Sequence, residues 1–236
     1  MDNRLKSIAD NMDSMLIGLD EPFRFHCDQC GECCIHRSDI LLSPYDVYRI
    51  AKELNCLPSE VARNYGDVYI GPDSRVPLIR IQPRGSIERC PFMLNHKCSI
   101  HAAKPTVCAL YPIGRMIGPD PKVPCSEDAS PKIQYIFQEP DCGDKSETHT
   151  VREWLNGFGI PVDDPIFVCW QNHFLKISME CRDAEKRLSK IKMEALWNLI
   201  FNLSYLNYNT EKPFEPQLEE NMHLLAAAMD IILGRA

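Results

Sequence analysis

The chain has 236 residues, 44% of them hydrophobic and 25% charged, with a formal net charge of −7 at pH 7. A chain of this length and apolar content can bury a core, as one domain with an extension or as two small domains. The negative charge argues against nucleic acid as a partner, because neutralising phosphate groups requires a basic surface. No segment is apolar for long enough to cross a bilayer, and the first residues lack the apolar run and cleavage site of a secretory signal. We therefore expect a cytoplasmic protein that binds neither nucleic acid nor membranes.

Helix signals precede and follow the first cysteines. Apolar residues at helical spacing predict an amphipathic helix over residues 4–19. Ser43, Pro44 and Asp46 supply an N-cap hydroxyl, a first-turn proline and a first-turn acid, which predict a helix over residues 43–55. The carboxylate of Asp46 suits this helix end through the helix dipole. The alternative role of Asp46 is a carboxylate near a metal.

Strand signals are short and few. Runs of β-branched and apolar residues predict two strands, over residues 76–82 and 133–138. The surrounding segment 112–140 is rich in Pro, Gly, Asp and Ser, so we expect it to be mostly loop. A capping box from Thr150 to Glu153 predicts a helix that ends near residue 157.

The last third of the chain is predicted to be helical. Asp164 and Pro165 open a helical pattern over residues 164–205, and a final helix ends at Leu233. The predicted fold is mainly α, an α+β chain with few short strands, whose irregular cysteine core is stabilised by metal. We expect a cysteine-cluster metal-binding domain over residues 1–160 and a helical C-terminal extension packed on it over residues 161–236. The extension is a candidate surface for a protein partner or a protein substrate.

Twelve cysteines are the most informative feature of the sequence. Disulfides do not persist in a reducing cytosol, so clustered thiols indicate metal or redox chemistry. Cys27 and Cys30 have the spacing of a metal knuckle, which turns both sulfurs toward one site, and Gly31 suits a turn that needs positive φ. Cys33 and Cys34 are adjacent, so in an extended chain they point to opposite sides. They could bind two metals, or one of them could be a nucleophile or support a ligand without binding metal.

Further cysteines follow in short motifs: Cys90-Pro91-Phe92, Cys98-Ser99-Ile100, Pro105-Thr106-Val107-Cys108, Tyr111-Pro112 and Cys142-Gly143. Together with the first cysteine group and the helix start at Ser43, this ordered set resembles the CxxCxxCC family of zinc- or iron-chelating cysteine-cluster proteins. That family includes the flagellin lysine N-methylases. The resemblance covers residues 25–154. The family usually has arginine where this chain has Lys104 and Ala109, so a role of those arginines toward an anionic ligand or a cluster is weakened here.

Eight cysteines are the predicted metal ligands: Cys27, Cys30, Cys33, Cys34, Cys90, Cys98, Cys108 and Cys142. Thiolate donors in the cytosol suit zinc or an iron–sulfur cluster, and these eight would serve two tetrahedral zinc sites. The run over residues 27–33 is also the start of a bacterial ferredoxin pattern. Its next ligand would fall at Arg37, so Cys108 or Cys142 would have to complete a cluster. The methylase resemblance and the CxxC spacing slightly favour a [4Fe-4S] cluster, with zinc as the alternative.

Histidines are weaker candidates for metal ligands. His26, His36 and His101 lie near cysteines in the sequence, and His36 is the first choice among them if the site mixes nitrogen with sulfur. The remaining cysteines are expected to pack or to be free thiols: Cys56, Cys125, Cys169 and Cys181.

The sequence contains no P-loop, no GxGxxG after a strand and no HExxH motif. The leading hypothesis is therefore a cytoplasmic metal-binding protein in which the metal is a structural or redox element. The resemblance implies one alternative, a protein-lysine N-methyltransferase like the flagellin methylases. Another is an electron-transfer or iron-handling partner of a second protein. Whether the chain is an enzyme stays open at this point.

Overall fold

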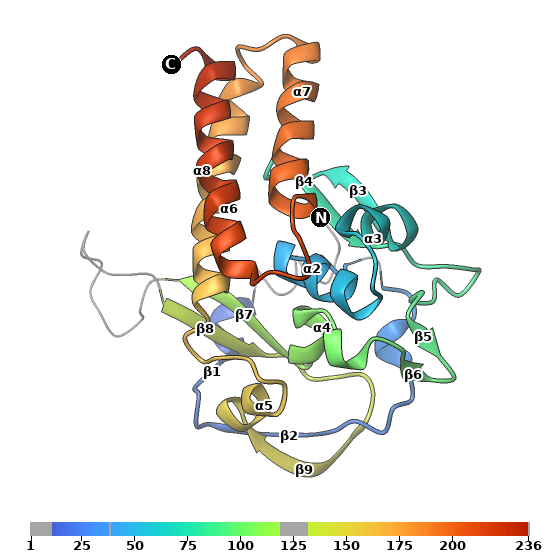
Figure 1. The fold of residues 1–236 in the computed structure, drawn as a ribbon. Helices are drawn as coiled ribbons and strands as arrows, with labels where there is room; N and C mark the ends of the chain where they lie inside the picture. Colours follow the sequence, from blue (N-terminus) through green and yellow to red (C-terminus); the bar gives the residue numbers. More distant parts are fainter. Residues whose placement is uncertain (1–10, 38, 119–131, 236) are drawn as a thin grey trace. The chain divides into compact units, whose positions relative to one another are not determined.

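The computed structural model describes residues 11–37, 39–118 and 132–235 of the chain. Helices take up 46% of these residues and strands 20%, so the fold is α+β (Figure 1). The mixed composition and the excess of helix over strand are confirmed. A mainly α fold and a core stabilised by metal do not follow from this composition.

The elements group by their contacts into two compact units, each built from two separate segments of the chain. The first unit comprises the described residues of Met1–Cys33 and Val107–Val168. The second unit comprises those of Cys34–Thr106 and Cys169–Ala236. The expected division into residues 1–160 and 161–236 stays a prediction.

The first unit combines antiparallel strands with short helical segments. Its elements are β1 (Leu16–Ile17), β2 (Pro22–His26), β7 (Ile113–Gly118), β8 (Lys132–Phe137), β9 (Asp144–Thr150) and α5 (Val151–Gly157). Strand β8 lies between β1 and β7 in a three-stranded sheet, and β2 pairs with β9. Its core consists of buried apolar residues: Phe23, Phe25, Ala109, Leu110, Ile113, Tyr135, Val151, Leu155 and Ile160. Strand β2 leads into the first cysteine and β9 follows the last predicted ligand, so both ends of the predicted ligand set are anchored in this unit.

The predicted N-terminal helix is only partly correct. Residues 11–15 are helical, but the chain continues as strand β1 instead of as helix to residue 19. Leu16 pairs with Ile136 on β8, so a tertiary contact overrides the helical spacing of the apolar residues. Residues 4–10 of the prediction lie outside the described part of the chain.

The segment expected to be mostly loop contains an unpredicted strand. Strand β7 pairs with the predicted strand β8, from Ile113 opposite Phe137 to Gly118 opposite Lys132. The glycines that suggested a loop instead permit close packing within this pair. A Cβ atom at Gly114 would lie 2.9 Å from Cγ1 of Ile136, so a larger residue would push the side chain on β8 aside.

The second unit is richer in helix. Its elements are α2 (Pro44–Glu53), α3 (Pro58–Tyr65), β3 (Gly66–Ile70), β4 (Pro77–Ile81), β5 (Met93–Leu94), β6 (Lys97–Cys98), η2 (His101–Ala103), α7 (Lys190–Phe201), η3 (Asn202–Leu206) and α8 (Phe214–Leu233). Three further elements lie where the chain passes from one unit to the other: η1 (Glu32–Cys34), α4 (Thr106–Leu110) and α6 (Pro165–Ala184). The core of the second unit is apolar: Val76, Ile177, Cys181, Ala184, Met193, Leu196, Ile200, Leu225 and Met229. Within the residues described, no helix has the length and apolar character needed to span a membrane.

Glu185, immediately after α6, and Trp197 on α7 hold the turn between β3 and β4. The guanidinium of Arg75 pairs with the carboxylate of Glu185, with Nε 2.7 Å from Oε2. The indole of Trp197 donates a hydrogen bond to the carbonyl oxygen of Arg75 at 2.9 Å. The predicted helical region 164–205 is thus confirmed as α6, α7 and η3, and the predicted strand over residues 76–82 is confirmed as β4.

The predicted helix starts are confirmed by their hydrogen bonds. Ser43 and Asp46 form a capping box at α2, and Thr150 and Glu153 form one at α5. Asp164 accepts the backbone N–H of Phe167 at 3.1 Å at the start of α6.

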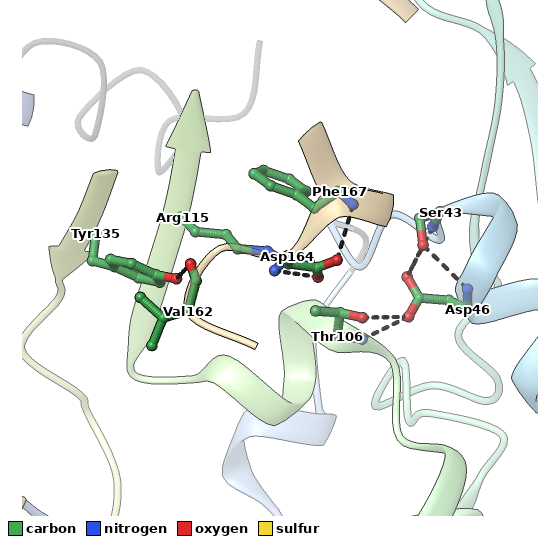
Figure 2. A network of polar contacts seen from close by, with 8 residues as sticks. All are labelled: Ser43, Asp46, Thr106, Arg115, Tyr135, Val162, Asp164 and Phe167. Atoms are coloured by element: carbon green, nitrogen blue, oxygen red, sulfur yellow. Dashed lines mark hydrogen bonds and ion pairs between the residues drawn. The ribbon is translucent and has the colours of Figure 1, made fainter. Parts of the chain in front are cut away.

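The other carboxylate oxygen of Asp164 accepts a hydrogen bond from Arg115 at 2.7 Å, as Figure 2 shows. The guanidinium carbon of Arg115 lies 3.9 Å from the centre of the Phe167 ring. Both charged side chains are nearly buried, with exposed fractions of 9% and 12%. Within the first unit, this ion pair therefore joins β7 to the first turn of α6.

Candidate metal centre

Eleven of the twelve cysteines lie in the described part of the chain, and Cys125 lies outside it. Five of the eight predicted ligands belong to the first unit: Cys27, Cys30, Cys33, Cys108 and Cys142. The other three belong to the second unit: Cys34, Cys90 and Cys98. The limit between the units falls between the adjacent residues Cys33 and Cys34.

The first two cysteines of the first unit, Cys27 and Cys30, lie in irregular backbone between β2 and η1. Gln29 and Gly31 both have positive φ, 59° and 80°, so the prediction for Gly31 is confirmed. The carboxylate of Asp28 accepts the backbone N–H of Cys30 at 3.1 Å, a local bond that holds the backbone of this segment. The segment thus has one local hydrogen bond and two residues of positive φ, features compatible with the predicted two-thiolate knuckle.

Pairing of β2 with β9 brings the last predicted ligand of this unit to the first. His26 pairs with Asp144, so Cys27 and Cys142 lie at the same end of the two-stranded ladder. Gly143 follows Cys142 with a φ of 72°, and a Cβ atom there would lie 2.3 Å from the carbonyl oxygen of His26. Only glycine allows this approach of the two strands, because any side chain at residue 143 would meet backbone atoms.

Several polar groups surround the sulfur of Cys142. The hydroxyl oxygen of Tyr111 lies 3.7 Å from it. Burial is the main cause that raises the pKa of the Cys142 thiol, and the Tyr111 hydroxyl opposes this shift. The nearby thiols of Cys33 and Cys30 raise the pKa further. Three predicted ligands of the first unit therefore share one electrostatic environment, which a cation would stabilise as thiolates.

The three predicted ligands of the second unit lie around a short hairpin. The backbone N–H of Cys90 donates to the carbonyl oxygen of Cys34 at 2.8 Å. Strands β5 and β6 then pair Met93 with Cys98, and Met93 also donates its N–H to the carbonyl oxygen of Cys90 at 3.1 Å. The backbone thus joins Cys34 to Cys90, and the turn and hairpin join Cys90 to Cys98.

The cysteine thiols suit a metal that prefers sulfur ligands, although the described sulfur atoms do not gather into a metal-binding cluster. Among the described residues, no group of three or more His, Cys, Asp or Glu side chains has the geometry of a metal site. The eight cysteines therefore remain predicted ligands. The thiolates themselves fit zinc or iron, because soft sulfur donors favour these metals over magnesium or calcium.

Asp46 has a structural role. It is 2% exposed, and one carboxylate oxygen accepts hydrogen bonds from the backbone and hydroxyl of Thr106 at 2.8 and 2.7 Å. The other oxygen accepts the corresponding bonds from Ser43 at 2.9 and 2.7 Å (Figure 2). Four donors surround this carboxylate, so the helix-start interpretation is favoured over a carboxylate near a metal.

The histidines near the cysteines pair with carboxylates or lie exposed. His26 Nδ1 lies 3.0 Å from one oxygen of Glu147, and His149 Nε2 lies 3.3 Å from the other. His36 Nδ1 lies 3.5 Å from Glu88, and His101 is exposed. These contacts give no support to a mixed nitrogen and sulfur site.

The cysteines predicted to pack or to be free differ in exposure. Cys181 is fully buried in the core of the second unit, and burial raises its pKa to about 12. Cys169 is exposed, with its sulfur 3.8 Å from that of Met222, and Cys56 is partly exposed. Cys181 is thus a packing residue, as predicted.

Two residues of the first-unit site were not predicted from the sequence. The Asp28 carboxylate, which accepts the backbone N–H of Cys30, and the Tyr111 hydroxyl, which lies against Cys142, were not predicted to act there. The signal for Asp28 was its position inside the CxxC spacing, where Asp commonly bonds to the backbone two residues on. Tyr111 stood in a motif with Cys108, but nothing local to that motif links it to Cys142.

The order of these cysteines matches a known family. Residues 26–134 match the CxxCxxCC family, which is described as "Putative zinc- or iron-chelating domain". The match, which spans less than half of the chain, confirms the resemblance that the cysteine motifs predict. The matched segment contains every predicted ligand except Cys142, which lies beyond its end. No curated protein and no solved structure matches the chain.

Proposed function

We propose that this chain binds zinc or iron through cysteine thiolates, and that the first unit supplies the principal site. Its ligands in this proposal are Cys27, Cys30, Cys33 and Cys142. The observation that carries the proposal is the environment of Cys142. The nearby thiols of Cys30 and Cys33 raise the pKa of its thiol. The pairing of His26 with Asp144 supports it, because this register brings the knuckle and Cys142 to one end of a ladder.

Cys108 and the cysteines of the second unit complete the predicted ligand set. Cys108 lies on α4 in the same unit as Cys142, and is the fifth thiol available to the first site. Cys34, Cys90 and Cys98 would supply three thiolates in the second unit, one fewer than a tetrahedral zinc site needs. This uneven distribution favours the first unit as the place of a complete four-thiolate site.

The proposed metal is a [4Fe-4S] cluster, with zinc as the alternative. Support for the cluster comes from the ferredoxin-like run over residues 27–33. An iron–sulfur cluster would supply one-electron chemistry, whereas zinc would supply a structural crosslink without redox change. In either case the Asp28 carboxylate holds the backbone of Cys30, Cys142 is partly shielded from water, and the Tyr111 hydroxyl lies beside its sulfur.

Metal and acid-labile sulfide analysis of protein purified without oxygen tests the proposal. Iron and sulfide at about four equivalents each, with visible absorbance, would identify a cubane cluster. Zinc at about one or two equivalents without colour would identify thiolate zinc sites. Protein that contains neither metal after reconstitution with either would show that the proposal is wrong.

The ligand assignment is tested with a matched pair of cysteine variants. Cys30→Ser removes a predicted ligand from the knuckle, and Cys169→Ser removes an exposed thiol that is not a predicted ligand. We expect loss of metal and of thermal stability in the first variant and neither loss in the second. Unchanged metal content in Cys30→Ser would contradict the ligand set.

The expected location and partners of the chain are also part of the proposal. A cytoplasmic location suits a chain that must keep many thiols reduced. The helical C-terminal region is proposed as a surface for a protein partner, supported by exposed apolar side chains on α6, α7 and α8: Leu175, Met179, Ile191 and Ile231. Nucleic acid is not proposed as a partner, because the net charge is −7. No described contact favours lysine methylation or electron transfer, so those alternatives stay predictions.

A further inference from the structure

Tyr111 places its hydroxyl group beside the sulfur of Cys142. The two atoms lie 3.7 Å apart, within the range of hydrogen bonds to sulfur. Tyr111 is only partly exposed, and so is Cys142. A hydrogen bond between them is therefore partly shielded from competing water.

The position of Tyr111 is fixed by the aromatic core of the first unit. Its ring packs edge-on against Phe25, with ring centres 6.0 Å apart and an angle of 87°. Phe25 is 2% exposed and packs in turn against Trp154 at 5.8 Å. Trp154 donates its indole N–H to the carbonyl oxygen of Leu110 at 3.0 Å, which fixes the backbone immediately before Tyr111.

The position of Cys142 depends on the same phenylalanine. Gly143 lies so close to Phe25 that a Cβ atom on the glycine would be 2.8 Å from Cε2 of the ring. Phe25 thus contacts both the tyrosine ring and the backbone that carries the cysteine. The Tyr111 ring and the backbone next to Cys142 both pack against the buried ring of Phe25. This shared contact holds the hydroxyl of Tyr111 close to the sulfur of Cys142.

We propose that Tyr111 is a positioning residue of the metal centre, whose hydroxyl donates a hydrogen bond to the thiolate of Cys142. This inference rests on the proposed function. A metal-bound thiolate has no proton to give, so the tyrosine must be the donor. The bond withdraws electron density from the sulfur, which raises the reduction potential of an iron–sulfur cluster and stabilises a zinc-bound thiolate against release.

Tyr111→Phe tests the proposal, because it removes the hydroxyl and keeps the ring against Phe25. With iron bound, we expect a lower midpoint potential than in the parent protein. With zinc bound, we expect transfer to a competing chelator to become about threefold to tenfold faster, the effect of one lost hydrogen bond. Thermal unfolding should change little, because the ring packing is retained.

Tyr135→Phe is the matched control. Tyr135 also lies in the first unit, and its hydroxyl donates to the carbonyl oxygen of Val162 at 3.1 Å. This variant removes a tyrosine hydroxyl bond of the same unit that involves no cysteine, so it should leave the potential and the zinc transfer rate unchanged. Equal effects in both variants would show that general loosening of the unit is responsible, and would overturn the proposal.

The outcomes separate this inference from the proposed function. If Tyr111→Phe keeps its metal with the potential or transfer rate of the parent, the hydrogen bond has no role and only this inference fails. If the parent protein binds neither zinc nor iron, the proposed function fails and the inference with it. A changed potential or transfer rate in Tyr111→Phe alone, at equal metal content, supports both.

Discussion

Asp46→Ala should strongly destabilise the second unit. The carboxylate is 2% exposed and accepts four hydrogen bonds, two from Ser43 and two from Thr106. Hydrogen bonds to charged groups contribute about 1.5–3 kcal/mol each, but the desolvation of the buried carboxylate offsets part of their sum. Loss of the capping box is included in this set and alone costs about 1 kcal/mol. We expect the free energy of unfolding to fall by about 3–5 kcal/mol.

Urea unfolding measures this loss, and two further variants show its origin. Thr106→Val removes one side-chain donor and retains the backbone bond to Asp46, so it should cost about 1 kcal/mol. Asp183→Ala removes an exposed carboxylate that pairs with Arg187 at 3.4 Å, and should cost about 0.5 kcal/mol or less. A loss below about 1 kcal/mol in Asp46→Ala would refute the argument that these four bonds stabilise the unit. Loss of metal without loss of stability would instead support the alternative of a carboxylate near the metal.

Two further predictions concern Gly143 and the thiols of α6. Gly143→Ala should cost about 2–4 kcal/mol and reduce metal content, because the new Cβ atom would lie 2.3 Å from the carbonyl oxygen of His26. Gly159→Ala, at a φ of 64° with open space around it, should cost only about 1 kcal/mol in the same unfolding assay. Cys181, whose burial raises its pKa to about 12, should react with iodoacetamide only after unfolding, whereas the exposed Cys169 should react in the native protein. Peptide mapping after a timed pulse distinguishes them, and native labelling of Cys181 would contradict its burial.

Helix starts could be predicted from the sequence because their determinants are local. The capping boxes at Ser43 and Thr150 each involve residues three apart, so the pattern of residue types contains the whole hydrogen-bond arrangement. Strands were harder to predict from the sequence than helix starts. Strand β9 is largely polar and exposed, so it lacks the alternation that identifies a strand, and it forms only because β2 pairs with it.

The ligand candidates could be predicted from the sequence, but their arrangement could not. Spacing identifies Cys27 and Cys30 as a pair, since a knuckle is a local structure. Cys142 lies near that pair only because β2 pairs with β9 so that His26 faces Asp144. Tyr111 lies beside Cys142 only because its ring and the backbone next to Cys142 both contact Phe25. Such contacts between distant segments leave no periodic signal in the chain.

Metal affinity should depend on pH in the direction set by Cys142. Burial raises the pKa of this thiol above its usual value of 9.0, and a thiol must lose its proton to bind metal. At neutral pH, binding therefore releases a proton. As the pH falls, metal affinity should decrease by about tenfold per pH unit for each proton released. For the metal-free protein the sign is opposite. A raised thiol pKa contributes stability that is present below the usual value and is lost as the pH rises through the raised one.

Chelator competition from about pH 6 to about pH 8.5 measures the affinity, and urea unfolding of metal-free protein from about pH 8 to about pH 11 measures the stability. Cys142→Ser should release fewer protons on binding and should flatten the stability curve above the usual thiol pKa. Cys169→Ser provides the control, because burial also raises the pKa of the Cys169 thiol, although this exposed cysteine is not a predicted ligand. If its proton release on metal binding equals that of Cys142→Ser, Cys142 has no special role as a ligand. If only Cys142→Ser differs from the parent, the residue beyond the matched family segment belongs to the metal site.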